Sequence, residues 1–144
     1  MLRFLVCALV LLFAPSAWAA PQRIVSLDYC ADQFVLALAD RNQIAGVSRG
    51  AGRDDSFFRA RAHGLRQIRP SLEEVLALHP DLIVRNWGGP WDAPAVYARF
   101  HVPVLHVGDV TDFAAARADL VRAADAFGQH ERGQALARDL NLRL

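Results

Sequence analysis

Short apolar runs alternate along this chain with segments whose apolar residues recur at helical spacing. The runs at 23–27, 44–48, 81–85 and 102–108 are five to seven residues long and contain Ile, Val and Leu, which predicts buried strands. The segments at 29–40, 71–79, 93–100, 112–128 and 131–144 place apolar side chains every three or four positions, which predicts helices. This alternation predicts an α/β fold, namely a mostly parallel sheet with helices on both faces, as in a Rossmann-like lobe.

The ends of the predicted helices carry sequence signals. Asp28 can cap the helix over 29–40, and Ser71 with Glu74 fits an S-x-x-E capping box at the start of the next one. The apolar face of that second helix comprises Leu72, Val75, Leu76 and His79. The last predicted helix runs to Leu144 with no cap, glycine or proline to close it. We interpret it as a helix that would continue in a longer protein.

The first 20 residues have a different character. Arg3 precedes an apolar run over 4–13, and Ala17, Trp18 and Ala19 form an A-x-A-like cleavage site. This is the pattern of a secretory signal peptide, so we expect export and removal of residues 1–20. The apolar run is shorter than the ~20 residues that span a bilayer, although a retained anchor is the alternative.

Composition excludes some classes of partner. Without the leader, 15 arginines balance 15 acidic residues and there is no lysine. Such a neutral, mixed surface has no footprint for nucleic acid or for an anionic membrane. Cys30 is then the one remaining cysteine, so we expect no internal disulfide, and the thiol is either packed or part of a site.

Polar and aromatic residues follow each predicted strand. In open parallel sheets, ligands bind beyond the carboxyl ends of the strands. Aromatic walls with a few polar groups suit a large, partly apolar ligand, and two tryptophans flank a Gly-Gly-Pro turn after the third strand. We therefore predict a binding site formed by Asp28, Tyr29, Cys30, Ser48, Arg49, Arg53, Asn86, Trp87, Gly88 and Trp91.

Motifs for catalysis, nucleotides and metals are missing from the sequence. It has no G-x-G-x-x-G after a strand, no phosphate-binding G-x-x-x-x-G-K-[ST], no G-x-S-x-G and no H-E-x-x-H. His79 and His106 fall within apolar patterns, so we interpret them as packed residues. We predict no catalytic residues, no resident cofactor and no bare metal ion.

Three segments carry a family resemblance: RIVSLDYCADQFVLALAD, PSLEEVLALHPDLIVRNWGG and VPVLHVG. They resemble the periplasmic substrate-binding proteins of ABC importers for cobalamin and ferric chelates, from Arg23 to the end. The resemblance implies a two-lobed periplasmic receptor that passes its ligand to a membrane permease. It divides this chain into a signal peptide (1–20), a first lobe (21–128) and the start of a connecting helix (129–144), with the second lobe missing.

The resemblance also implies one residue role and a ligand class. An acidic residue of the SLEE-like motif docks onto the permease in this family, and the matching position is Glu73. The tryptophan turn favours a corrinoid, whereas the arginines of RGAGRDD favour an anionic ferric siderophore or haem. Two other classes stay open: a zinc or manganese receptor that uses His63 and His106, and an exported Rossmann-like enzyme.

Overall fold

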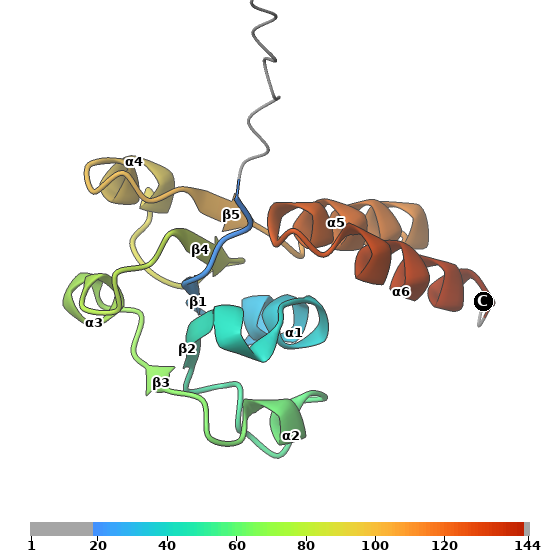
Figure 1. Ribbon diagram of the computed structural model, residues 1–144, viewed down its shortest axis with the longest axis horizontal. Helices are drawn as coiled ribbons and strands as arrows, with labels where there is room; N and C mark the ends of the chain where they lie inside the picture. Colours follow the sequence, from blue (N-terminus) through green and yellow to red (C-terminus); the bar gives the residue numbers. More distant parts are fainter. Residues whose placement is uncertain (1–18, 143–144) are drawn as a thin grey trace, which may run out of the picture.

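Five strands form a parallel sheet in the computed structural model, which describes residues 19–142 (Figure 1). The strands are β1 (Ile24–Ser26), β2 (Ile44–Ser48), β3 (Gln67–Ile68), β4 (Leu82–Arg85) and β5 (Val104–His106). Their order is β3-β2-β1-β4-β5, and every neighbouring pair is parallel. The chain leaves β1 toward β2 on one side and later returns to β4 on the other. The junction of β1 and β4 is therefore the topological switch point, where ligands of such sheets bind.

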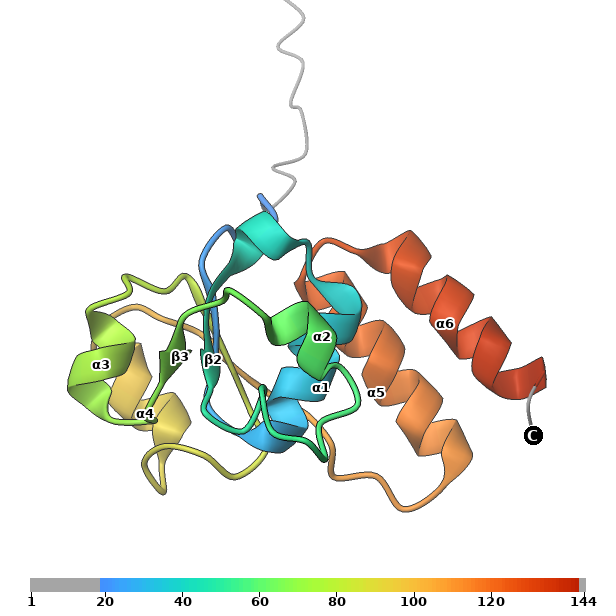
Figure 2. The ribbon, with the colours of Figure 1, turned by 90° about the horizontal axis from the view of Figure 1, so that it is seen from below.

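Helices cover both faces of this sheet, which confirms the predicted fold class (Figures 1 and 2). α1 and α5 pack on one face and α3 and α4 on the other, while α6 lies against α5 on the side away from the sheet. The helices are α1 (Tyr29–Leu38), η1 (Arg41–Gln43), α2 (Arg59–Ala62), α3 (Leu72–Leu76), α4 (Ala93–Ala98), α5 (Phe113–Ala126) and α6 (His130–Leu142).

Adjacent residues of β1 supply the two halves of the core. Ile24 packs with Val35 and Phe127 on the side of α1 and α5, and Val25 packs with Tyr97 on the side of α3 and α4. All five are fully buried. Burying each large apolar side chain stabilises the fold by about 1.5–3 kcal/mol, which is why a strand of three residues suffices at the centre of the sheet.

The structure corrects the sequence interpretation at short elements and at two histidines. β3 and α2 were not predicted, because two and four residues are too few to show a periodicity. α3 ends at Leu76, and His79 is exposed with φ of 47° rather than packed on the helix. A residue that precedes proline is disfavoured in the right-handed α conformation, so Pro80 explains this early end. His106 is also exposed, because β5 is an edge strand.

The predicted capping box is half formed. The Ser71 hydroxyl accepts the backbone N–H of Glu74 at 3.3 Å. The Glu74 carboxylate does not return the bond but accepts the backbone N–H and the Nε–H of Arg69, both at 2.8 Å. These bonds from Arg69 hold the pKa of Glu74 below its usual value.

The turn between α5 and α6 coincides with the predicted division at residue 128. Gly128 has φ of 71°, the left-handed conformation that ends a helix at a glycine. α6 then packs closely on α5, since a Cβ at Gly133 would overlap that of Ala124. The division into a lobe and a connecting helix stays a prediction, and the predicted signal peptide lies almost entirely outside the described residues. None of the helices within residues 19–142 is long and apolar enough to cross a membrane.

Candidate functional site

The carboxylate of Asp28 joins the two loops at the switch point. Asp28 caps α1, and its Oδ1 accepts the backbone N–H of Ala31 at 3.0 Å. Its Oδ2 accepts three consecutive backbone N–H groups of the loop after β4, from Asn86 (2.7 Å), Trp87 (3.1 Å) and Gly88 (2.9 Å). Asp28 is 1% exposed, so these bonds form away from competing water. The loop after β4 is thereby fixed to the start of α1.

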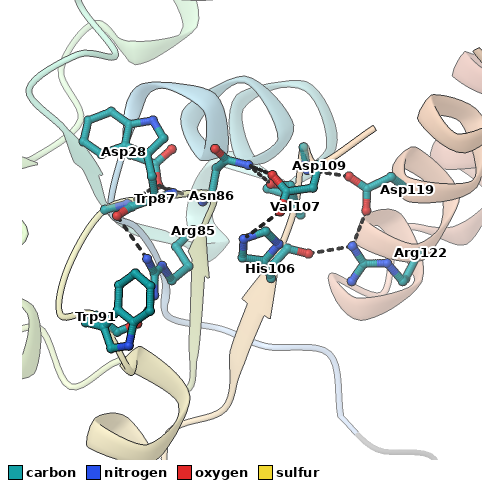
Figure 3. A network of polar contacts seen from close by, with 12 residues as sticks. Asp28, Arg85, Asn86, Trp87, Trp91, His106, Val107, Asp109, Asp119 and Arg122 are labelled. Atoms are coloured by element: carbon teal, nitrogen blue, oxygen red, sulfur yellow. Dashed lines mark hydrogen bonds and ion pairs between the residues drawn. The ribbon is translucent and has the colours of Figure 1, made fainter. Parts of the chain in front are cut away.

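Arg85, the last residue of β4, holds the same loop from its other side. Its Nη2 donates to the Trp87 carbonyl at 3.0 Å, and its Nη1 donates to the carbonyls of Pro90 at 3.2 Å and Trp91 at 3.5 Å. We call residues 86–92 the tryptophan loop. Figure 3 shows Asp28 and Arg85 with their bonds to this loop.

A third attachment links the tryptophan loop to the loop after β5. The Asn86 side chain donates to the Val107 carbonyl at 2.6 Å and to the Asp109 carboxylate at 3.0 Å. Beyond it, the Asp119 carboxylate accepts the backbone N–H of Gly108 at 2.7 Å and is paired with Arg122. This polar network runs from α1 across β4 and β5 to α5 (Figure 3).

The backbone of the tryptophan loop lies so close to β1 that only glycine fits at one position. A Cβ at Gly88 would lie 2.5 Å from the Leu27 carbonyl oxygen and 2.8 Å from its carbon. Both are backbone atoms of the chain leaving β1 and cannot move aside. Gly88 is therefore needed for close approach, which allows the amide of residue 88 to reach Asp28.

Both tryptophan side chains are exposed on this fixed backbone. Trp87 is 63% exposed and Trp91 is 99% exposed. Each indole presents a large apolar surface to water, which is unfavourable unless something covers it. The structure thus places two uncovered aromatic rings on a loop whose backbone is held by hydrogen bonds on three sides.

The loop after β2 is held by a different set of contacts. We call residues 49–58 the arginine loop. The Ser48 hydroxyl donates to Asp32 at 2.6 Å and accepts the Gly50 N–H at 2.9 Å, while the Asp32 carboxylate also accepts the Ser48 N–H. Farther along, the Tyr29 hydroxyl donates to the Asp55 carbonyl at 2.8 Å. Helix α1 therefore anchors this loop as well.

Burial raises the pKa of Asp32 to about 6, from an ordinary value of 3.8. Hydrogen bonds from Ser48 and Ser26 oppose this shift, and the neighbouring charge of Asp28 adds to it. The removal of a carboxylate from water is thus the dominant effect, because these hydroxyl and amide groups replace only part of its hydration.

Three side chains of the arginine loop point into solvent. Arg49 and Arg53 are exposed, and Arg53 forms a 3.2 Å ion pair with Asp55 in which both groups are mostly exposed. Phe57 is 83% exposed and contacts Phe58 edge-to-face, with ring centroids 4.8 Å apart. Cationic and aromatic groups thus flank the start of α1 opposite the tryptophan loop.

Comparisons with known proteins fit this geometry. No family model matches the chain. The vitamin B12-binding proteins of Pectobacterium carotovorum and Pectobacterium atrosepticum are each 32% identical to it over 111 residues, which cover 73% of this chain and 38% of theirs. The chain therefore spans less than half the length of the curated relatives it matches.

Solved structures share the arrangement of strands and helices. The periplasmic vitamin B12-binding protein BtuF of Vibrio cholerae matches with a TM-score of 0.67 and 20% identity, over 85% of this chain and 48% of its own. The periplasmic haem-binding protein RhuT of Roseiflexus sp. RS-1 matches with 0.67 and 27%, over 82% and 45%. This chain has the fold of a periplasmic binding protein. The resemblance predicted from the sequence is thereby confirmed.

Within this periplasmic-binding-protein fold, the ligand varies among the similar structures. The molybdate-binding protein MolA of Haemophilus influenzae has a TM-score of 0.66 at 16% identity, which compares with the values for the vitamin B12 and haem proteins. Because the same fold holds such different ligands, the fold alone does not select one.

The structure brings the predicted site residues to the carboxyl edge of the periplasmic-binding-protein sheet, but in two roles. Those with accessible side chains are Tyr29, Cys30, Arg49, Arg53, Asn86, Trp87 and Trp91. The side chains of Asp28 and Ser48 are buried and bonded to backbone groups, and Gly88 has no room for a side chain. In the structure these three residues hold or shape the loops, and the assignment of all ten residues to a ligand site stays a prediction.

Sequence reasoning missed Asp32, Arg85, Asp119, Arg122 and Phe57. The signal for Arg85 was a charged residue at the end of an apolar strand, next to the turn. Asp32 stands among apolar residues on the first helix, one turn after Asp28. Within residues 19–142, no three His, Cys, Asp or Glu side chains are grouped closely enough to hold a metal ion.

Proposed function

We propose that this chain is the ligand-capturing part of the substrate-binding component of an ABC importer. It takes up a metal chelate in the periplasm and delivers it to the membrane permease, without chemistry. Support comes from the curated relatives, which are named vitamin B12-binding proteins, and from the shared fold. Residues 21–128 form the capturing lobe in this proposal and residues 129–144 begin the helix toward a second lobe.

The observation that carries the proposal is the pair of exposed indoles on a restrained backbone. A bound planar or corrin-like ligand would cover Trp87 and Trp91 and remove their apolar surface from water. Because Asp28 and Arg85 already hold the loop, little conformational entropy is lost on binding. In this proposal Asp28, Ser48, Asn86 and Gly88 shape the loops, and the exposed side chains, above all Trp87 and Trp91, contact the ligand.

The polar groups at the edge narrow the ligand class. Arg49 and Arg53 are exposed and can meet anionic groups, as on a ferric siderophore or the propionates of haem. Trp87 and Tyr29 supply apolar and stacking contacts that also suit a corrinoid. The curated relatives favour the corrinoid, and the arginines favour the anionic chelates, so both are tested side by side.

Tryptophan fluorescence tests the capture of a chelate. In the chain with Trp18→Phe, Trp87 and Trp91 are the two remaining tryptophans. Cobalamin, cobinamide, haem and ferric siderophores are titrated with correction for their absorbance. We expect saturable quenching by one class, weak because a second lobe would supply the other contacts, and reduced at least about tenfold in affinity by Trp87→Ala.

An exposed aromatic residue away from the site provides the control. Phe100 is 45% exposed and precedes β5, at the opposite edge of the sheet from the tryptophan loop. Phe100→Ala should leave quenching unchanged. Quenching by no chelate, in the chain or in a form extended by its second lobe, would contradict the proposal.

Docking onto the permease is the second part of the proposal. Glu73 is exposed on the first turn of α3, and this turn follows β3 at the carboxyl edge of the sheet. Glu73→Lys should abolish stimulation of the importer's ATPase in proteoliposomes and leave chelate quenching unchanged. Glu131→Lys reverses an exposed acid in the first turn of α6 and is the matched control. Equal stimulation by Glu73→Lys and the unmodified chain would sink this assignment.

Export is the third part. The periplasmic location of the structural relatives supports it, together with the leader-like sequence of residues 1–20. The mass of the protein recovered from the periplasm should correspond to cleavage after Ala19 or Ala20. Recovery of the full-length chain from the membrane fraction would instead support the retained-anchor alternative.

A further inference from the structure

We propose that Arg85 is the positioning residue of the tryptophan loop and sets how well the indoles of Trp87 and Trp91 are aligned for a ligand. The inference rests on the proposed function for what the rings bind. The arrangement of the loop itself can be tested with no ligand present. Arg85 touches no ligand in this account and acts through the backbone that carries the two rings.

Arg85 bonds directly to the backbone of both tryptophans. Its guanidinium donates to the carbonyls of Trp87 and Trp91 and to that of Pro90 between them, at 3.0, 3.5 and 3.2 Å. The side chain starts on β4, which is paired on both sides within the sheet. One rigid strand residue thus fixes the spacing between the peptide groups of both tryptophans (Figure 3).

The chemistry of this position favours arginine over lysine. Two separate nitrogens of the rigid, planar guanidinium, Nη1 and Nη2, reach carbonyls four residues apart, whereas a lysine would have to reach both from a single nitrogen on a flexible stem. The third nitrogen, Nε, is buried and has no hydrogen-bond partner among the described residues. A partly desolvated charge is unfavourable in itself, and the bonds to the loop carbonyls offset this cost.

Asp28 holds the first half of the tryptophan loop, and Arg85 bonds to both its start and its second half. Asp28 accepts the N–H groups at 86–88, and Arg85 donates to carbonyls at 87, 90 and 91. Past Gly88, Arg85 bonds to the carbonyls of Pro90 and Trp91, and Asp92 ties the end of the loop to α4 as the cap of that helix. Loss of Arg85 should therefore loosen the second half of the loop while the first half stays on Asp28.

The first readout is independent of any ligand. In the chain with Trp18→Phe, time-resolved fluorescence anisotropy reports nanosecond motion of the two indoles. We expect the amplitude of fast motion to rise at least about twofold in Arg85→Met, which keeps the apolar stem, and in Arg85→Lys, which keeps the charge. Arg99→Met, at an exposed arginine at the end of α4, should match the unmodified chain.

The second readout is affinity for whichever chelate quenches the unmodified chain. We expect both Arg85 variants to bind on the order of tenfold to a hundredfold more weakly, because misplacement of the rings by a fraction of an ångström removes stacking contact. Urea unfolding is measured in parallel, and affinities are compared where all variants are folded. If Arg85→Met does not fold, Arg85→Lys decides.

The outcomes separate this inference from the proposed function. Unchanged fast motion and unchanged affinity in folded Arg85 variants would overturn the positioning role. The positioning role would also be overturned if Arg85→Lys matched the unmodified chain in both fast motion and affinity, since a positive charge alone would then suffice. If no chelate quenches the unmodified chain, the proposed function fails, and the anisotropy still decides whether Arg85 positions the loop.

Discussion

The tryptophan loop and the arginine loop are both held by carboxylates near the start of α1, but in different ways. Asp28 accepts three backbone N–H groups of the tryptophan loop. Asp32, one helical turn later, reaches the arginine loop through Ser48. The tryptophan loop has a second attachment through Arg85, whereas the arginine loop is tied farther along by the hydroxyl of Tyr29.

The two carboxylates differ in how fully hydrogen bonds compensate for their burial. Asp28 receives four N–H donors, the number that a charged carboxylate readily accepts, so its charge is compensated. Burial of Asp32 is compensated less well, and its pKa rises to about 6. The anchor of the arginine loop is therefore a carboxyl group that becomes neutral in mild acid, as the pH falls through about 6.

The largest effect should come from removing the anchor of the tryptophan loop. Asp28→Ala leaves three loop amides and the start of α1 unpaired, and we expect a loss of about 3–5 kcal/mol in the free energy of unfolding. Urea denaturation measures it. Asp112→Ala is the control, since Asp112 caps α5 through one bond to the Ala115 N–H at 2.7 Å. That variant should cost about 1 kcal/mol. Equal losses of unfolding free energy in Asp28→Ala and Asp112→Ala would show that the bonds between Asp28 and the loop amides do not stabilise the fold.

The second effect is a pH dependence in the anchor of the arginine loop. The pKa of Asp32 is raised in the fold, so the folded state binds its proton more tightly than the unfolded chain does. Its contribution to stability is full below pH 3.8 and is lost as the pH rises through about 6. This amounts to at most about 3 kcal/mol.

Comparison with a neutral isostere isolates this contribution. Asp32→Asn cannot titrate, so the difference in unfolding free energy between it and the unmodified chain should change across pH 4–6 and stay constant above about 7. Urea unfolding at a series of pH values measures this difference. A difference that is flat across the whole range would mean that Asp32 titrates normally.

The third effect compares the same substitution in the two loops. Gly88→Ala forces a Cβ against the Leu27 backbone and should cost about 1–3 kcal/mol. At Gly52 the nearest atom is the end of the Gln67 side chain, which can rotate away. Gly52→Ala should therefore change stability by less than about 1 kcal/mol in either direction. Thermal unfolding of both variants measures the contrast, and a costlier change at Gly52 would reverse the ranking of the loops.

The smallest effect on stability should come from Arg53. Its ion pair with Asp55 is largely exposed, so Arg53→Ala should shift the free energy of unfolding by less than about 0.5 kcal/mol. Affinity should respond differently: an anionic chelate should bind more weakly to this variant, and a neutral corrinoid should bind equally well. Fluorescence titration with both ligands measures this. Equal affinities for the anionic chelate would remove Arg53 from the site.

The larger elements of the fold were predictable because their signals are local. Four strands and five helices follow from apolar runs and helical spacing, and the cap at Asp28 follows from its type and place. β3 and α2 are too short to produce a pattern. His79 shows the limit of periodicity, since its spacing matched the helix although Pro80 ends the helix before it. The predicted site residues do lie at the carboxyl edge of the sheet, and their contacts with a ligand stay a prediction.

The sequence by itself determined that this protein alternates strands with helices and that aromatic and charged residues gather after the strands. These are properties of neighbouring residues. Only the tertiary structure decided that Asp28 holds residues about 60 positions away, that Arg85 bonds back to the loop it precedes, and that Trp87 and Trp91 are left exposed. A hydrogen bond depends on distances of about 3 Å between atoms, and for such distant residues the packing of the sheet sets those distances.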